Sequence, residues 1–384
     1  MSNPDNKYTK LRWILTISGL LLYMVDIFMD VAVALKYFQD KDYVWAGLTM
    51  VFILVGLVVT QIFSYAWYID DMNDVMINPG RTEEISGMST GVLTVIHLFG
   101  MGIFTRYYHL LKKAFEVVWT SARTDDHHKL FCHATDLSML KMFEAFLESV
   151  PQLLLQLYIV LGHNESSVIQ YLCMAFSFFN AAWALVDYRR CLRRSIPRFR
   201  EMPSGLPAAV YLLYKLCTIT SRILSYTLLL MLSIYSTIAL PILWLLATIW
   251  THTLKTDFCS TLTSKHKRLE FLYRAVVGVI LMFTFFNVKG QDTKVAMTVY
   301  YCFYTLMNIL TLSLLGFLKP GLQKGTFLMT VSGVISWGSV LGLVSLVLYY
   351  LFLHPRETLR EADEVDGIGR EVVITGRINN FLQP

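Results

Sequence analysis

Charged residues are scarce in this sequence. Asp, Glu, Lys and Arg make up 16% of the 384 residues, against roughly 25% in an average soluble domain. Hydrophobic residues make up 55%, and the mean hydropathy is +0.50. One buried core cannot enclose that much apolar surface, so lipid is the natural solvent for the remainder. The scarcity of charge therefore favours a membrane protein over a soluble one.

Several motifs that mark common functional classes are also missing. The six cysteines contain no C-x-x-C pair, so neither a disulfide framework nor a thiolate zinc site is indicated. The phosphate-binding loop G-x-x-x-x-G-K-[ST] does not occur, so nothing indicates nucleotide-driven pumping. The net charge of +5 forms no basic stripe with interleaved aromatics, and we expect no nucleic-acid partner. The first apolar run lacks a small-residue cleavage site, which argues against a cleavable signal peptide.

Long apolar runs account for most of the chain. A helix needs about 20 apolar residues to cross a bilayer. Eight long runs lie at 13–35, 44–68, 141–161, 168–188, 210–235, 237–252, 295–317 and 327–353. Two weaker runs, at 88–104 and 271–287, are expected to cross only in part and re-enter. The sequence therefore predicts an all-α membrane protein with about eight transmembrane helices and two partial, re-entrant helices.

Lysine and arginine set the expected orientation, because short cytoplasmic loops are enriched in both. Lys7, Lys10 and Arg12 precede the first run. The strongest basic loop is expected over 189–200, and other basic stretches lie at 105–140 and 253–270. With eight crossings, both termini are expected in the cytoplasm.

The positions of the apolar runs and of the basic residues divide the chain into three regions. We expect a cytoplasmic N-terminus over 1–12, a transmembrane domain over 13–353 and a cytoplasmic regulatory tail over 354–384. Each half of the transmembrane domain would hold four crossings and one partial helix. That count hints at two pseudo-symmetric halves, an arrangement common in transport folds.

Ionisable residues interrupt the apolar runs. They are Asp26, Asp30, Lys141, Glu144, Glu148, Asp187, Lys215 and Arg222. Each costs roughly 2.5–3.5 kcal/mol near the bilayer centre on insertion scales. They either form internal ion pairs that fix helix packing, or line a polar route for an ion, a solute or a lipid headgroup. The helical spacing of Asp26 with Asp30 and of Glu144 with Glu148 puts like charges on one face, which favours the polar route.

The run over 141–161 has a break at its centre. Pro151 lacks an N–H and clashes with the carbonyl four residues earlier, so we expect a kink near Leu147. Glu148 and Gln152 bring polar atoms to that break. A broken polar helix at membrane depth is costly unless it lines a cavity or a functional seam.

The tail contains a protease recognition sequence, Asp363-Glu364-Val365-Asp366-Gly367. Executioner caspases cut after an aspartate that has an acid at the fourth subsite position, and they favour a small residue after the cut. Cleavage is expected between Asp366 and Gly367, in an extended segment near a terminus. The released piece contains several apolar residues and is expected to dock on the membrane domain and hold it inactive.

The sequence resembles a known family, the XK-related proteins, and most closely their caspase-activated phospholipid scramblases. The resemblance extends over almost the whole chain. It rests on Tyr23–Asp30, the Glu148-Ser149-Val150-Pro151-Gln152-Leu153 stretch, the basic loop after Asp187, Arg222 and the tail residues Asp363–Gly367.

The resemblance implies a plasma-membrane protein with cytoplasmic termini, whose cleaved form scrambles phospholipids passively and without ATP. Phosphatidylserine would then reach the cell surface as an engulfment signal. It also implies that the lipid path is formed by Asp26, Asp30, Lys141, Glu144, Glu148, Asp187 and Arg222. An executioner caspase and phospholipids are the implied partners, and some relatives need a single-pass membrane subunit. No cofactor is implied.

Two other classes remain open. A secondary transporter or channel for a small polar or ionic solute would use buried charges equally well. A lipid-modifying enzyme would need a nucleophile or a metal constellation, and we find no convincing one. The cluster His127-His128-x-x-x-Cys132-His133 would bind a metal only if it were helical, and on a polar loop we expect it to be solvated.

Overall fold

The computed structural model describes residues 8–77, 89–119, 124–163, 168–195, 202–203, 205–232, 235–253, 266–287, 294–318 and 326–353. The secondary structure of these residues is helical, as the sequence predicts. The chain forms two compact units, which divide between Gln152 and Leu153. Each unit is described by itself below.

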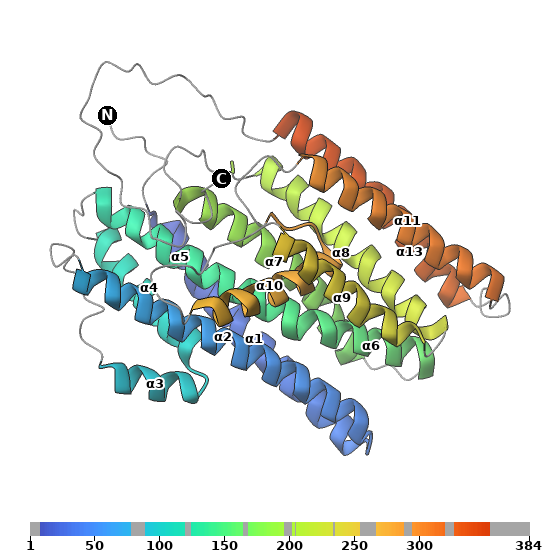
Figure 1. Ribbon diagram of the computed structural model, residues 1–384, viewed down its shortest axis with the longest axis horizontal. Coiled ribbons are helices and arrows are strands. Elements are labelled where there is room, and N and C mark those ends of the chain that lie inside the picture. The colour runs from blue at the N-terminus through green and yellow to red at the C-terminus, as the bar shows by residue number, and fades with distance from the viewer. Residues whose placement is uncertain are drawn as a thin grey trace. The chain divides into compact units, whose positions relative to one another are not determined.

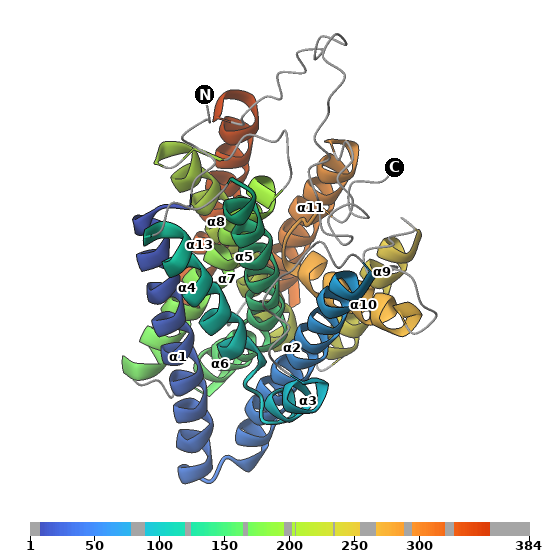
Figure 2. The ribbon, with the colours of Figure 1, turned by 90° about the vertical axis from the view of Figure 1, so that its left-hand side faces the viewer.

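The first unit begins with a long hairpin of α1 and α2 (Figure 1). Its elements are α1 (Lys10–Gln39), α2 (Tyr43–Ile77), α3 (Thr90–Leu98), α4 (Gly102–Trp119), α5 (Thr124–Glu144), η3 (Ala145–Ser149) and the start of α6 (Val150–His163). α2 packs against α1, α3, α4, α5 and η3, and α4 packs against α1 and α5. Figure 2 shows the short helix α3 lying against α2. α2 is therefore the central helix of this unit.

The second unit is arranged around α8 (Leu206–Leu232). Its other helices are α7 (Val168–Ser195), α9 (Ser236–Thr253), α10 (His266–Phe283), α11 (Lys294–Leu318), α13 (Thr326–Leu348) and η4 (Tyr349–Leu353). α8 packs against α7, α9, α10, α11, α13 and η4. Figure 1 shows α11 and α13 running along α8.

Six helical segments in the described part are long and apolar enough to cross a membrane. They are Lys10–Gln39, Tyr43–Met72, Asp126–Gly162, Leu206–Leu232, Lys294–Leu318 and Met329–Leu353. The runs at 168–188 and 237–252 form α7 and α9, which are not among these six segments. Within α9, Thr237–Thr253 is a shorter apolar helix. A multi-pass membrane protein is therefore supported, but the predicted count of eight crossings is not confirmed.

A π-helical turn lies where the sequence predicts a kink, near Leu147. Residues Ala145–Ser149 form η3, and the N–H of Val150 donates to the carbonyl of Ala145, five residues earlier. The wider turn accommodates the ring of Pro151, because it removes the need for the bond that proline cannot make. The helix is thus continuous through the break instead of interrupted.

Two expectations about the connecting segments are wrong. The basic stretch expected as a loop from residue 189 is helical up to Ser195, so Arg189, Arg190, Arg193 and Arg194 occupy the last turns of α7. Positively charged side chains at this position interact favourably with the negative end of the helix dipole. The His127–His133 segment is not a loop either but part of α5.

Candidate functional site

Four carboxylates lie buried in the first unit. Asp26 and Asp30 on α1 are 7% and 6% exposed, and Glu144 and Glu148 at the end of α5 and in η3 are 7% and 5% exposed. The structure therefore brings together the two like-charged pairs that the sequence put on single helical faces. Electrostatic interactions link Glu144 and Glu148 to each other and to both aspartates.

Hydroxyl groups surround this carboxylate cluster of Asp26, Asp30, Glu144 and Glu148. Ser149 donates from Oγ to Asp26 Oδ2 at 3.4 Å. The Tyr23 hydroxyl forms a hydrogen bond with the Glu144 carboxyl, and the Asp30 and Glu148 side chains hydrogen-bond each other. These bonds satisfy some of the oxygen atoms, and the bond between Asp30 and Glu148 requires a proton on one of the two carboxyl groups, because an ionised carboxylate only accepts.

Lys141 is the basic residue that the sequence grouped with these acids. Its ammonium interacts with the Glu144 carboxylate, and Nζ lies 5.9 Å from the centroid of the Tyr107 ring. One ammonium balances one carboxylate, so any further ionised carboxyl group in the cluster leaves an excess of negative charge. At membrane depth such an excess must be offset by a proton, by water or by a cation that enters the cluster.

Gly56 on α2 lets the carboxylate cluster come this close. A Cβ at this position would lie 2.7 Å from Glu148 Oε2 and 2.9 Å from Glu148 Cβ. The missing side chain therefore provides the space that the Glu148 side chain fills. No local sequence pattern marks Gly56, because Glu148, which approaches it, is distant in the chain.

The two remaining predicted path residues, Asp187 and Arg222, belong to the second unit. Asp187 on α7 is only half-buried. Arg222 on α8 is 2% exposed and donates from Nε to the Met282 carbonyl of α10 at 3.3 Å. Its guanidinium also lies over Tyr226 and Tyr304, with ring centroids at 4.7 and 5.7 Å.

A second buried cation, Lys215, lies two turns before Arg222. It is 2% exposed and donates from Nζ to Thr284 Oγ1 and to the Phe285 carbonyl, both at 2.9 Å. The sequence identified Lys215 as a charge inside an apolar run, but the resemblance did not place it in the lipid path. Its position two helical turns before Arg222, on the same face of the helix, is the sequence pattern that could have indicated a shared site.

Arg189 was missed as a site residue, because the sequence placed it in a loop. It donates from Nη1 to the hydroxyl groups of Tyr211 at 3.1 Å and Tyr350 at 2.9 Å. Its guanidinium also stacks over the Tyr211 ring at 4.7 Å. One arginine thus joins the end of α7 to α8 and to η4.

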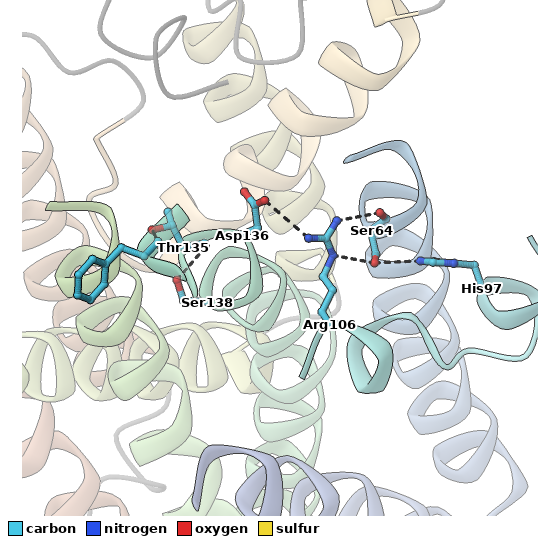
Figure 3. A network of polar contacts seen from close by, with 7 residues as sticks. Ser64, His97, Arg106, Thr135, Asp136 and Ser138 are labelled. Atoms are coloured by element: carbon cyan, nitrogen blue, oxygen red, sulfur yellow. Dashed lines mark hydrogen bonds and ion pairs between the residues drawn. The ribbon is translucent and has the colours of Figure 1, made fainter. Parts of the chain in front are cut away.

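A further polar network in the first unit was not predicted (Figure 3). Arg106 on α4 donates from Nε to Ser64 Oγ and from Nη2 to the Ser64 carbonyl, both at 3.0 Å, and pairs with Asp136 at 3.6 Å. His97 on α3 lies 3.0 Å from Ser64 Oγ through Nε2. The network therefore ties α2, α3, α4 and α5 together around one buried guanidinium.

The partners of His97 assign its tautomer. Nδ1 lies 2.8 Å from the Leu93 carbonyl, which only accepts, so Nδ1 carries the proton. Nε2 then accepts from the Ser64 hydroxyl, which itself accepts from Arg106. Burial lowers the pKa of His97; its bond to Leu93 opposes that shift, and the Arg106 charge adds to it. Neutral His97 therefore holds α3 against α2.

The sequence also raised a possible metal cluster and a protease site. In the part of the chain that the structure describes, no group of three or more His, Cys, Asp and Glu side chains is arranged to hold a metal ion. His127, His128, Cys132 and His133 are all described as part of α5 and form no such group. The expected caspase site, Asp363 to Gly367, lies outside the described residues.

Comparison with known proteins identifies similar chains. The family model for XK-related protein matches residues 14–355. XK-related protein 9 of Tetraodon nigroviridis is 56% identical over 383 residues, covering 98% of this chain and 100% of that protein. XK-related protein 8 of Pan troglodytes is 29% identical over 360 residues, covering 92% and 87%. XK-related protein 8 of Tetraodon nigroviridis is 27% identical over 349 residues, covering 91% and 84%.

Proposed function

Because this chain belongs to the XK-related family, we propose that it is a phospholipid scramblase activated by cleavage of its C-terminal tail. It moves lipids between leaflets passively and without ATP, so it is not an enzyme. An executioner caspase cuts after Asp366, and phosphatidylserine then reaches the surface of the apoptotic cell. The protein acts in the plasma membrane, with both termini in the cytoplasm.

The carboxylate cluster is the observation that supports this proposal best. Asp26, Asp30, Glu144 and Glu148 are buried in segments long and apolar enough to cross a membrane. Bringing a charged headgroup into hydrocarbon costs several kcal/mol. Buried carboxyl groups that can ionise lower that cost for the ammonium group of a headgroup, while the acyl chains stay in lipid.

The test uses purified full-length protein in liposomes that contain fluorescent phospholipid, with dithionite added outside. Before caspase treatment, bleaching should stop near one leaflet. After cleavage it should proceed well beyond one leaflet, with a parallel trapped dye showing that dithionite stays outside. Asp366→Ala should remove the response to caspase. Bleaching of one leaflet in both states would contradict the proposal unless addition of a single-pass membrane subunit restored the response.

A secondary transporter or channel for a small polar or ionic solute is the alternative. The same buried charges support it, because a hydrated path serves a solute as well as a headgroup. Flux of radiolabelled ions and amino acids into the same liposomes separates the two functions. Solute flux without lipid movement would favour the alternative.

A further inference from the structure

Two buried cations of α8 hold the C-terminal end of α10. Lys215 binds Thr284 Oγ1 and the Phe285 carbonyl, and Arg222 binds the Met282 carbonyl. α10 ends one residue after Met282. The last carbonyls of a helix lack partners within the helix and lie at the negative end of its dipole. The cations therefore cap α10 from a neighbouring helix.

The capping leaves part of the binding capacity of Arg222 unused. Its Nη1 atom is buried and has no hydrogen-bond partner among the described residues. Such an open donor is costly in an apolar interior, and most buried donors find an acceptor. Lys215 and Arg222 thus donate to neutral hydroxyl and carbonyl oxygens, with one donor of Arg222 still open toward a further acceptor.

We propose that Lys215 and Arg222 form a binding site for a phosphate group, and that the end of α10 occupies this site in the full-length chain. A phosphate offers a cation a charge-to-charge attraction in addition to the hydrogen bond, whereas a peptide carbonyl offers the hydrogen bond alone. A phosphate therefore competes with peptide carbonyls for both cations. The inference rests on the proposed function, because the phosphate is taken to be that of a lipid headgroup.

The contacts of α10 show what its end must break to leave the site. α10 is attached to α9 by a bond from Trp244 Nε1 to the Ala275 carbonyl at 2.9 Å and by close contact of Gly278 with Thr248. Its end is held on α8 by the two cations, by the Tyr226 hydroxyl, which donates to the Met282 carbonyl at 2.9 Å, and by the contact of the Phe283 ring with Tyr226. The rings that follow contact aromatic side chains of other helices, Phe285 with Tyr300 and Phe286 with Tyr188. Displacing the end together with α9 therefore breaks these polar and ring contacts and preserves the α9–α10 pair.

The test weakens the occupant and leaves both cations in place. Thr284→Val removes one acceptor of Lys215, and Tyr226→Phe removes one donor to α10. If the end of α10 blocks the site, the double variant should scramble fluorescent phosphatidylcholine at least fivefold faster than uncut wild type, because the loss of each of its two hydrogen bonds corresponds to about that factor. If the contact only stabilises the fold, scrambling by uncut protein should be unchanged or fall.

Thr311→Val is the matched control. Thr311 is a buried threonine on α11 whose hydroxyl bonds only its own helix, at the Met307 carbonyl. Its uncut rate should equal that of wild type. Cleaved wild type is the positive control: if it does not scramble, the proposed function fails, whereas if it scrambles and the double variant shows no gain, only this inference fails.

A complementary measurement tests the cation directly. Lys215→Met should slow scrambling by the cleaved protein about fivefold, while Lys215→Arg should restore most of the rate. An equal loss in both variants would contradict phosphate binding. Inorganic phosphate added at constant ionic strength should not slow cleaved wild type, and inhibition by it would assign the site to free phosphate instead of a headgroup.

Discussion

At the scale of single residues, protonation of His97 is expected to loosen the first unit. Its folded pKa is lowered, so the unfolded chain binds more protons over the range between the two pKa values. The contribution of neutral His97 is present above its ordinary pKa of about 6.5 and is lost as the pH falls through the lowered value. The melting temperature in detergent should therefore decrease on acidification.

His97→Gln provides the comparison for this pH effect. Glutamine retains an acceptor for Ser64 and does not titrate, so the variant should lose less stability than wild type over the same pH range. Burial and neighbouring positive groups also lower the pKa of His109, so some acid sensitivity should remain in the variant. Identical pH profiles for the two proteins would contradict a role for His97.

Glu148 is the residue whose loss should affect lipid movement most directly. Glu148→Gln keeps the size of the side chain and removes one ionisable carboxyl group from the carboxylate cluster. Scrambling by the cleaved protein should slow by about tenfold, equivalent to about 1.4 kcal/mol. Glu116→Gln, at an exposed position on α4, is the control and should leave the rate unchanged.

The carboxylate cluster of the first unit was predictable from sequence, whereas the pairing of Lys215 and Arg222 with α10 in the second unit was not. The spacing of Glu144 and Glu148 puts them on one helical face wherever that helix packs. The caps of Lys215 and Arg222 on α10 join segments about 60 to 70 residues apart, and no local pattern encodes that pairing.

At the scale of helices, close approach at glycine positions fixes the packing of the carboxylate cluster. Gly56→Ala should push Glu148 away, because the new Cβ would lie 2.9 Å from Glu148 Cβ. Scrambling by the cleaved protein should slow by roughly fivefold or more. Gly47→Ala on the same helix has no atom within 4 Å of its new Cβ and should behave as wild type.

The contact between α8 and α13 depends on a small-x-x-x-small pattern, Gly338 and Gly342. A Cβ at Gly342 would lie 2.7 Å from Thr218 Cγ2 and 3.3 Å from Cys217 Cβ. Gly342→Ala should destabilise the protein by about 1–3 kcal/mol, measured as a lower melting temperature in detergent. Gly333→Ala, which has open space around it, should have no such effect.

Helix positions could be predicted from hydropathy, but helix ends could not be predicted equally well. The stretch with Arg189 and Arg193 looked like a loop, because charge normally ends a membrane span. In the structure α7 continues to Ser195, and Arg189 is held by tyrosine hydroxyls. Tertiary partners thus extended a helix that composition alone would end.

At the scale of the whole molecule, the prediction concerns orientation. Basic residues precede the first span and follow α7, so both termini should face the cytoplasm. Epitope tags at the two termini should be protected from protease added outside intact cells and become digestible after permeabilisation. Digestion of one tag in intact cells would mean an odd number of crossings.

The π-helical turn η3 contains one residue more than an α-helical turn would, within a continuous helix. Converting it to α-helical geometry would advance the chain by about 1.5 Å and rotate all later side chains of that helix by about 100°. Such a shift alters which side chains meet without unwinding any part of the helix. Pro151 lies two residues after η3 and cannot donate the bond to the Leu147 carbonyl that α-helical geometry requires, so proline disfavours this conversion and favours keeping the extra residue beside Glu148.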